Sequence, residues 1–198
     1  MGCWLMAWNK LGTTTLGSAG DTITVSGITS NQFIHILTHA LGSNADKKLK
    51  FNNNGNSVYA RRYSDGGGSD GTTTSTTNIA HSTLLTDEFL IGYVLNKSGE
   101  EKLLMTFTVA SNSSGAGNVP ARLELVGKFV PSPDADITRV DDINTHTGDL
   151  DADTNLSVIG SDGTESLNVQ DGAIYYDTDL NKEYVLYNNT WTEVWKYI

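Results

Sequence analysis

Short runs in which hydrophobic and polar residues alternate extend over most of this chain, and Gly, Asn, Asp and Ser interrupt them every several residues. In residues 21–27, Ile23 and Val25 alternate with hydroxyl side chains, and a glycine ends the run. Alternation with a period of two is typical of a strand that buries one face. Because amphipathic helical patterns do not interrupt these runs, the pattern predicts an all-β protein.

Two pairs of neighbouring runs are predicted to form hairpins. Residues 47–51 and 58–63 are joined by an Asn-rich turn with an Asn-Gly pair, and these residue types tolerate a left-handed backbone. Residues 89–95 and 103–109 are strongly apolar and are joined by a polar turn. Counting all such runs gives about ten strands, at the spacing expected of a sandwich or barrel. Hairpins with long connecting loops favour an antiparallel, jelly-roll-like β-sandwich.

The pattern divides the chain into three parts. Residues 1–5 are expected to be an N-terminal extension that precedes a natural start at Met6, residues 6–163 the β-sandwich domain, and residues 164–198 a small C-terminal β-meander appendage. A three-stranded meander is close to the smallest sheet that holds together, so we expect the appendage to dock on a neighbour. Its aromatic residues are Tyr175, Tyr176, Tyr184, Tyr187, Trp191 and Trp195.

Composition and charge exclude several classes of function. The net charge of −10 repels phosphate backbones and argues against a nucleic-acid partner. No run reaches the roughly eighteen apolar residues that cross a bilayer, so we expect a soluble protein without a membrane partner. The single cysteine, Cys3, excludes an internal disulfide framework and a cysteine-based zinc site. Stability must therefore come from packing or from oligomerisation.

Asp149, Asp151 and Asp153 are the candidate metal ligands, because calcium prefers several carboxylate and carbonyl oxygens. Their spacing matches the acidic start of an EF-hand loop. The glycine that such a loop needs at its sixth position is absent, however, and Gly160 stands where the final glutamate belongs. The two interpretations that remain are an irregular calcium site and a solvated acidic loop. We expect no other cofactor.

Catalytic motifs are missing from the sequence. His35 and His39 lie in an apolar run, residues 32–41, which is predicted to be a central strand buried on both sides. The glutamate that a zinc protease motif requires does not follow His35, so core or interface histidines are expected instead. The Ser-rich turns lack a nucleophile elbow, and no pair of carboxylates is singled out for sugar cleavage. We therefore expect a protein that is not an enzyme.

The aromatic side chains of the appendage admit two interpretations. Their rings could stack on sugars, as in an adhesin that binds a glycan. Alternatively, they form the small core of the appendage or a contact between subunits, where large amphipathic rings are equally favoured.

Several segments resemble small virion structural proteins of tailed bacteriophages. These segments are residues 6–12, 21–25, 59–67, 115–128, 137–140, 148–150, 156–160 and 172–191. Together they are spread over most of the length of the chain. The last of them is similar to short β repeats that close many phage tail, fibre and capsid-surface proteins.

This resemblance implies a protein on the exterior surface of the virion, either a capsid decoration protein or a head-fibre protein. It also implies a homo-oligomer, with a trimer favoured, that contacts other virion proteins such as the major capsid protein. The alternative is a tail-associated adhesin that binds a glycan on the host surface.

Overall fold

A computed structural model describes residues 8–29, 31–42, 45–81, 86–111, 113–133, 135–161, 172–187 and 190–194. The contacts divide the chain into a large unit, Trp8–Gly163, and a small unit that contains the C-terminal residues. Every regular element in the described residues is a β-strand, and all named strand pairs are antiparallel. The predicted all-β class is confirmed. The described part of the chain contains no helix that could cross a membrane.

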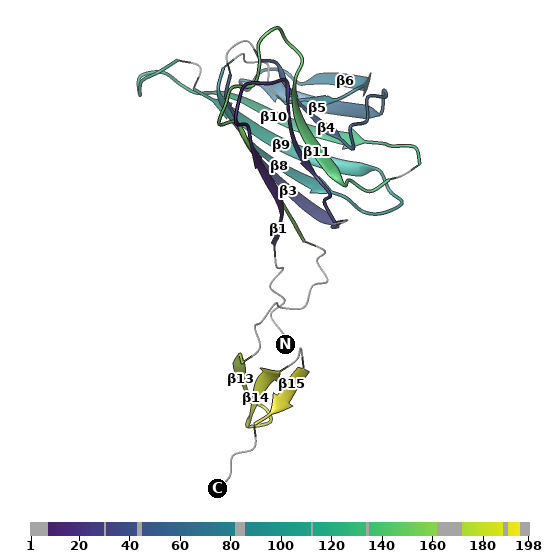
Figure 1. The fold of residues 1–198 in the computed structure, drawn as a ribbon, viewed down its shortest axis with the longest axis vertical. Helices are drawn as coiled ribbons and strands as arrows, with labels where there is room; N and C mark the ends of the chain where they lie inside the picture. The colour runs from purple at the N-terminus through teal and green to yellow at the C-terminus, as the bar shows by residue number, and fades with distance from the viewer. Residues whose placement is uncertain are drawn as a thin grey trace. The chain divides into compact units, whose positions relative to one another are not determined.

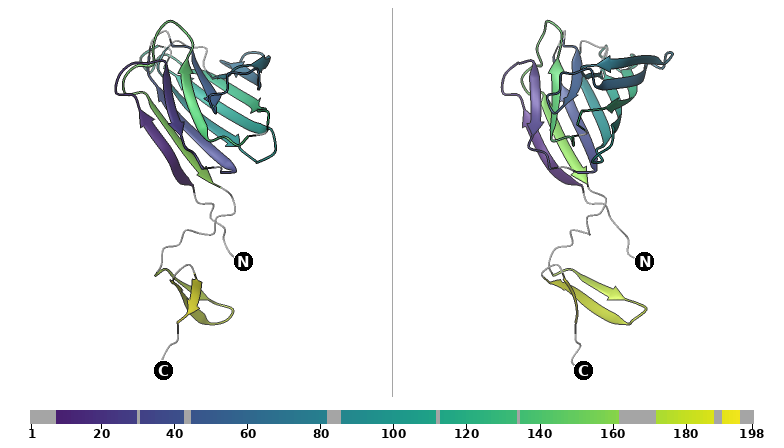
Figure 2. Two further views of the ribbon diagram at one scale, coloured as in Figure 1. Left: turned by 45° about the vertical axis from the view of Figure 1, so that its right-hand side comes forward. Right: turned by 90° about the vertical axis from the view of Figure 1, so that its right-hand side faces the viewer.

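Two sheets form the large unit (Figures 1 and 2). The eight-stranded sheet consists, in spatial order, of β1 (Asn9–Thr15), β12 (Asn155–Ser161), β3 (Phe33–Ala40), β8 (Glu88–Leu95), β9 (Lys102–Ala110), β10 (Ala121–Phe129), β5 (Tyr59–Asp65) and β6 (Gly71–Thr76). The four-stranded sheet consists of β2 (Thr22–Ser26), β11 (Arg139–Asn144), β4 (Lys47–Phe51) and β7 (Ile79–Ala80).

The strand order is that of a jelly roll. Four antiparallel pairs, β1·β12, β2·β11, β3·β8 and β4·β7, form one long hairpin whose pairs alternate between the two sheets. When this hairpin rolls up, the pairing β12·β3 joins two of its strand pairs in the eight-stranded sheet, and β11·β4 joins the other two in the four-stranded sheet. Strands β5, β6, β9 and β10 are insertions into this plan, and they extend the large sheet beyond β8. The structure thus confirms the predicted jelly-roll-like sandwich.

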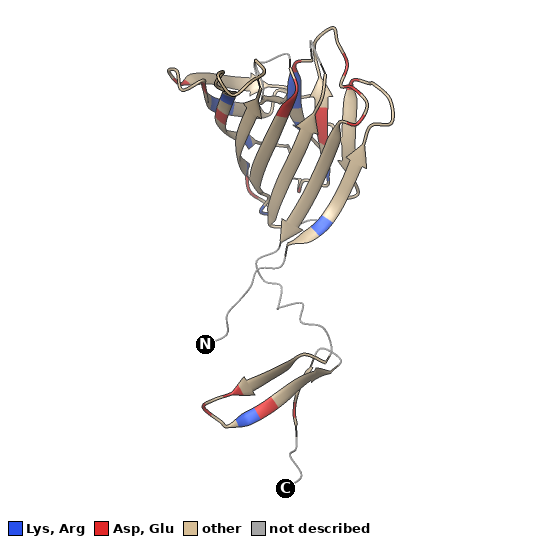
Figure 3. Cartoon of the chain, turned by 90° about the vertical axis from the view of Figure 1, so that its left-hand side faces the viewer, with Lys and Arg blue, Asp and Glu red and all other residues tan. Residues whose placement is uncertain are grey.

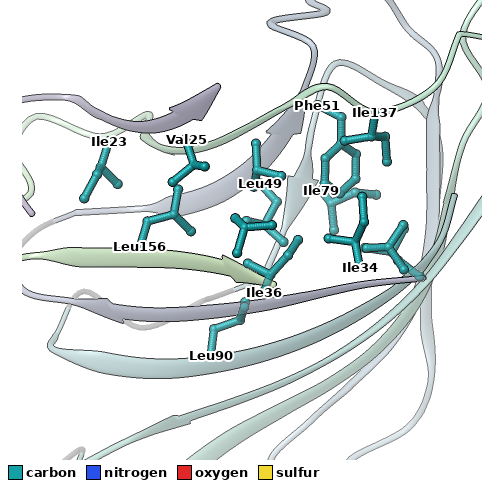
Figure 4. Packing of buried hydrophobic residues seen from close by; sticks show 14 of the residues in the cluster. Ile23, Val25, Ile34, Ile36, Leu49, Phe51, Ile79, Leu90, Ile137 and Leu156 are labelled. Atoms are coloured by element: carbon teal, nitrogen blue, oxygen red, sulfur yellow. The ribbon is translucent and has the colours of Figure 1, made fainter. Parts of the chain in front are cut away.

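The core lies between the two sheets, where alternate residues of each strand point inward. Figure 4 shows side chains of the four-stranded sheet, such as Leu49 and Phe51, opposite Ile36 and Leu90 of the eight-stranded sheet. These residues are buried because their strands alternate at the period that the sequence predicts. An aromatic group at one side of the core stacks Tyr59 on Phe129, with ring centres 4.8 Å apart.

One predicted hairpin is wrong. β4 and β5 correspond to the runs at 47–51 and 58–63, but β4 pairs with β11 and β7, while β5 pairs with β10 and β6. The Asn-rich turn between them carries the chain from one sheet to the other. Asn52 has a φ of 55° and its side chain binds the backbone of the segment that leads into β11, including the Thr138 N–H at 2.9 Å. The other predicted hairpin, β8·β9, is confirmed.

The small unit is a three-stranded antiparallel sheet of β13 (Ile174–Asp177), β14 (Lys182–Tyr187) and β15 (Thr190–Glu193). The β13–β14 turn is held by the carboxylate of Asp177, which accepts hydrogen bonds from the N–H groups of Asp179 and Leu180, both at 3.0 Å. The predicted meander at the C-terminal end is therefore present.

Replacing Leu90 with alanine tests the core directly. Leu90 is fully buried, so Leu90→Ala should lower the free energy of unfolding by about 2–5 kcal/mol, through lost burial and the cavity that remains. Val119 is 80% exposed, and Val119→Ala should change that free energy by less than about 0.5 kcal/mol. Urea unfolding followed by circular dichroism measures both. Equal losses in the two variants would contradict this assignment of the core.

Candidate interaction surface

Strand β9 carries apolar residues on the face that points away from the core. Its inward residues, which include Leu104 and the hydroxyl residues Thr106 and Thr108, are buried. Its outward residues, Leu103, Met105, Phe107 and Val109, are each between 46% and 51% exposed. A strand whose outer face meets water normally carries polar residues there. The outward row of β9 therefore has the composition of a buried surface.

The neighbouring strands extend this row across the sheet. Directly opposite residues share a face, and the register places Tyr93 of β8 and Val126 of β10 on either side of Met105. Phe89 of β8 lies opposite Val109. We call the resulting surface the outer apolar face. It consists of Phe89, Tyr93, Leu103, Met105, Phe107, Val109 and Val126.

Strand β3 continues the outer apolar face with an aromatic stack. The His35 ring lies 4.4 Å from the Tyr93 ring with the two planes nearly parallel, and Trp8 approaches its edge at 6.0 Å. Burial lowers the pKa of His35, so its imidazole is neutral at pH 7 and compatible with an apolar surface. His35 and His39 do lie on one face of a strand, as expected. That strand is central, but its outer side is half-exposed, so the prediction of burial on both sides is wrong for a single chain.

Polar residues border the outer apolar face on both sides. Toward β1 and β12 the border consists of hydroxyl and amide side chains, where Thr13 bonds Ser157 at 3.1 Å and Asn155 bonds Thr15 at 2.7 Å. Toward β10, β5 and β6 the border consists of ion pairs. These pairs are Arg122 with Glu124, Lys128 with Glu101, and Arg62 with Asp70. An apolar centre inside a polar rim is the usual anatomy of a protein–protein interface.

A shallow pocket of about 240 Å³ lies at the boundary between the outer apolar face and its charged border. Met105, Phe107 and Val126 form its apolar side. Arg62, Ser64, Asp70 and Glu124 form its polar side. Its mixture of apolar and hydrogen-bonding groups suits a side chain of a partner protein as well as a small polar ligand.

The predicted aromatic residues of the small unit divide between its two faces. Tyr175 stacks on Tyr184 at 5.1 Å and meets Trp191 edge-on at 4.9 Å, which makes a small aromatic cluster on one face. Tyr176 and Tyr187 lie on the opposite face and are 51% and 66% exposed. Trp195 lies outside the described residues. Tyr175 and Trp191 stay 42% and 40% exposed within the cluster, so both faces of the small sheet present aromatic rings.

The candidate calcium ligands are not brought together. Asp149, Asp151 and Asp153 are all exposed, and backbone hydrogen bonds, such as the one from the Asp151 N–H to the carbonyl of Leu41 at 3.0 Å, hold their loop. Within the ranges that the structure describes, no group of three or more His, Cys, Asp or Glu side chains is arranged to hold a metal ion.

A buried ionic cluster was not predicted from the sequence. His81 follows β7, and its Nε2 lies 3.1 Å from Oδ1 of Asp142 while its Nδ1 lies 3.0 Å from Oε1 of Glu88. Burial alone would lower the pKa of His81, but the charge of Asp142 and hydrogen bonds to both carboxylates raise it to about 10. All three side chains are fully buried, which leaves no access for a substrate. The imidazolium joins the two sheets, since Glu88 belongs to β8 and Asp142 to β11.

The outer apolar face was likewise missed, although a signal for it exists. Residues 89–95 are apolar at both odd and even positions, which indicates a strand covered on both sides, and residues 103–109 are apolar at every odd position. The sequence alone does not reveal whether the surface that covers the second face belongs to the same chain.

No family model, curated protein or solved structure matches this chain.

The His81 cluster makes the stability of the protein depend on pH. The folded state holds the pKa of His81 near 10, above the ordinary value of 6.5, so the folded state binds a proton that the unfolded state releases between these values. The stabilisation should be fully present below pH 6.5. It should then fall by at most about 1.4 kcal/mol per pH unit as the pH rises toward 10.

Urea unfolding at pH 6.5, 8.0 and 9.5 measures this decline. His146 is exposed, and the variant His146→Gln should keep the same pH dependence. His81→Gln should be less stable than the wild type at pH 6.5, because it leaves two buried carboxylates without a cation, and should lose the decline. A wild-type stability that does not change over this range would show that His81 is not held in its charged form.

Proposed function

We propose that this protein is a non-enzymatic structural subunit of a tailed-phage virion, a capsid decoration or head-fibre protein on the exterior surface that works as an oligomer. The observation that carries this proposal is the outer apolar face, which covers the centre of a large sheet and is exposed in the single chain. Exposed apolar surface of this extent is typical of proteins that associate with other proteins. The function is then to assemble, and it needs no catalytic group.

The jelly-roll fold is compatible with this proposal, but it does not single it out. Jelly rolls occur in viral capsid proteins and in lectins, and a fold by itself does not determine function. The virion assignment rests on the resemblance of segments such as residues 59–67 and 115–128 to phage structural proteins. The oligomer, for which a trimer is favoured, and the contact with the major capsid protein are part of the same proposal.

Charge supports an exterior position. The chain carries a net charge of −10, and Asp and Glu are few along the strands of the large unit (Figure 3). Carboxylates concentrate instead in loops such as residues 149–153. A subunit of this kind presents acidic, well-hydrated loops to solvent and keeps its apolar surface for contacts.

A glycan-binding adhesin is the second candidate. It is favoured by the exposed rings of Tyr176 and Tyr187 on the uncovered face of the small sheet, since flat aromatic surfaces with a polar tip suit sugar rings. The pocket beside Glu124 offers a further mixed surface of this kind.

Purified virions provide the test of the first candidate. The protein should be present in virions in many copies, and mass measurement of the free protein should give a multiple of the chain mass. Treatment with protease should digest it on intact particles, because an exterior protein is accessible. A stable monomer that is absent from purified virions would reject the proposal.

Glycan-array binding tests the second candidate. If the small unit is an adhesin, the wild type should bind defined glycans, and Trp191→Ala or Tyr187→Ala should reduce binding at least tenfold, depending on which face of the sheet carries the site. Val119→Ala, in the large unit, is the matched control and should bind as the wild type does. Absence of binding by the wild type to any glycan would count against an adhesin.

A further inference from the structure

We infer that the outer apolar face is where copies of this chain bind one another, packed face to face about the axis of a closed homo-oligomer. This inference deepens the proposed function and rests on it, since it names the surface and the partner of the assembly. Three observations support it: the size of the face, its charge and its symmetry.

The size of the face matches what a stable interface needs. A whole Phe or Tyr side chain covers about 150–250 Å², so a half-exposed ring offers on the order of 100 Å². Seven side chains of comparable exposure offer on the order of 700 Å². Each partner in an interface of standard size buries ~800 Å². The outer apolar face is therefore large enough to hold two copies together without the participation of another protein.

The charge of the face selects a second copy as its occupant. Two chains of net charge −10 repel each other, and this repulsion opposes association least where the facing surfaces carry few carboxylates. The outward positions of β12, β3, β8 and β9 contain no Asp, Glu, Lys or Arg, since the two charged residues in these strands, Glu88 and Lys102, are buried on the inward side. A positively charged partner would find no complementary group on these four strands, whereas an identical uncharged face is fully compatible.

The arrangement of the face is self-complementary. The apolar residues form a band along β8 and β9, and polar side chains border it on both sides. In a closed oligomer every copy turns the same surface toward the symmetry axis, so the apolar bands gather at the axis and the polar borders lie outside them. The Tyr93 and Phe107 rings belong to the band, and aromatic anchors of this kind supply most of the binding energy of an interface.

Phe107→Glu is the variant that tests the inference. It places a carboxylate in the middle of the band, and burying that charge against an apolar partner is strongly unfavourable. Sedimentation equilibrium of the full chain over a range of concentrations should show a wild-type homo-oligomer. For Phe107→Glu the dissociation constant of that oligomer should rise at least 100-fold, with a monomer at micromolar concentration.

Thr22→Glu is the matched control. It adds the same charge at an exposed strand position on the outward side of the four-stranded sheet, and its oligomer should be unchanged. Phe107→Thr is a second variant for the case that Phe107→Glu does not fold. Threonine favours strands and adds no charge, so this variant should retain the fold. It should raise the dissociation constant at least tenfold. Circular dichroism and thermal unfolding establish that each variant is folded.

The outcomes separate this inference from the proposed function. A wild-type oligomer that both Phe107 variants leave intact would overturn the inference, while assembly through another surface would leave the proposed function standing. A wild type that is monomeric at all concentrations but present on virions would also overturn the inference, because the face would then bind a different virion protein. A monomer absent from virions would reject both.

Discussion

The four-stranded sheet covers one face of the eight-stranded sheet, and the other face of that sheet carries apolar side chains that the strands of the large unit leave exposed. The alternation of side chains along a strand makes this unavoidable, because every apolar residue inserted between two inward positions must point outward. In β8 and β9 the inward set supplies the core with residues such as Leu90 and Leu104, and the outward set is apolar as well. The large unit thus has more apolar surface than its two sheets bury, and this surplus is the physical basis on which we propose that subunits associate.

Much of the fold could be predicted from the sequence, because the period-two pattern is a local property that each strand carries by itself. Pairing is not local, and this is why the predicted hairpin between residues 47–51 and 58–63 was wrong. The Asn-rich turn is well suited to a hairpin, but Asn52 binds the backbone next to Thr138, which is distant in sequence, and β4 then pairs with β11. A turn motif specifies a change of direction. It does not specify which strand becomes the neighbour.

The candidate sites were predicted less well, for related reasons. The acidic residues at 149–153 are close in sequence, yet their side chains do not converge, whereas His81, Glu88 and Asp142 converge from three elements that no sequence spacing connects. The aromatic residues of the small unit can be found from the sequence, but their division between two faces depends on the register of β13 with β14. The buried His81 cluster also explains how the sheets keep their alignment, since a shift of one sheet against the other would leave charged groups without partners.

The rolled hairpin has a consequence for the order in which the chain can acquire its structure. Its innermost pair joins strands that are close in sequence, as Lys48 lies opposite Ala80, whereas its outermost pair places Asn9 opposite Gly160. Contacts between distant residues form late, because closing a long loop costs more entropy than closing a short one. During synthesis β1 therefore has no partner until β12, the last strand of the jelly roll, has been made. Until then β1 must be shielded from other nascent chains, and premature association is the hazard that this topology creates.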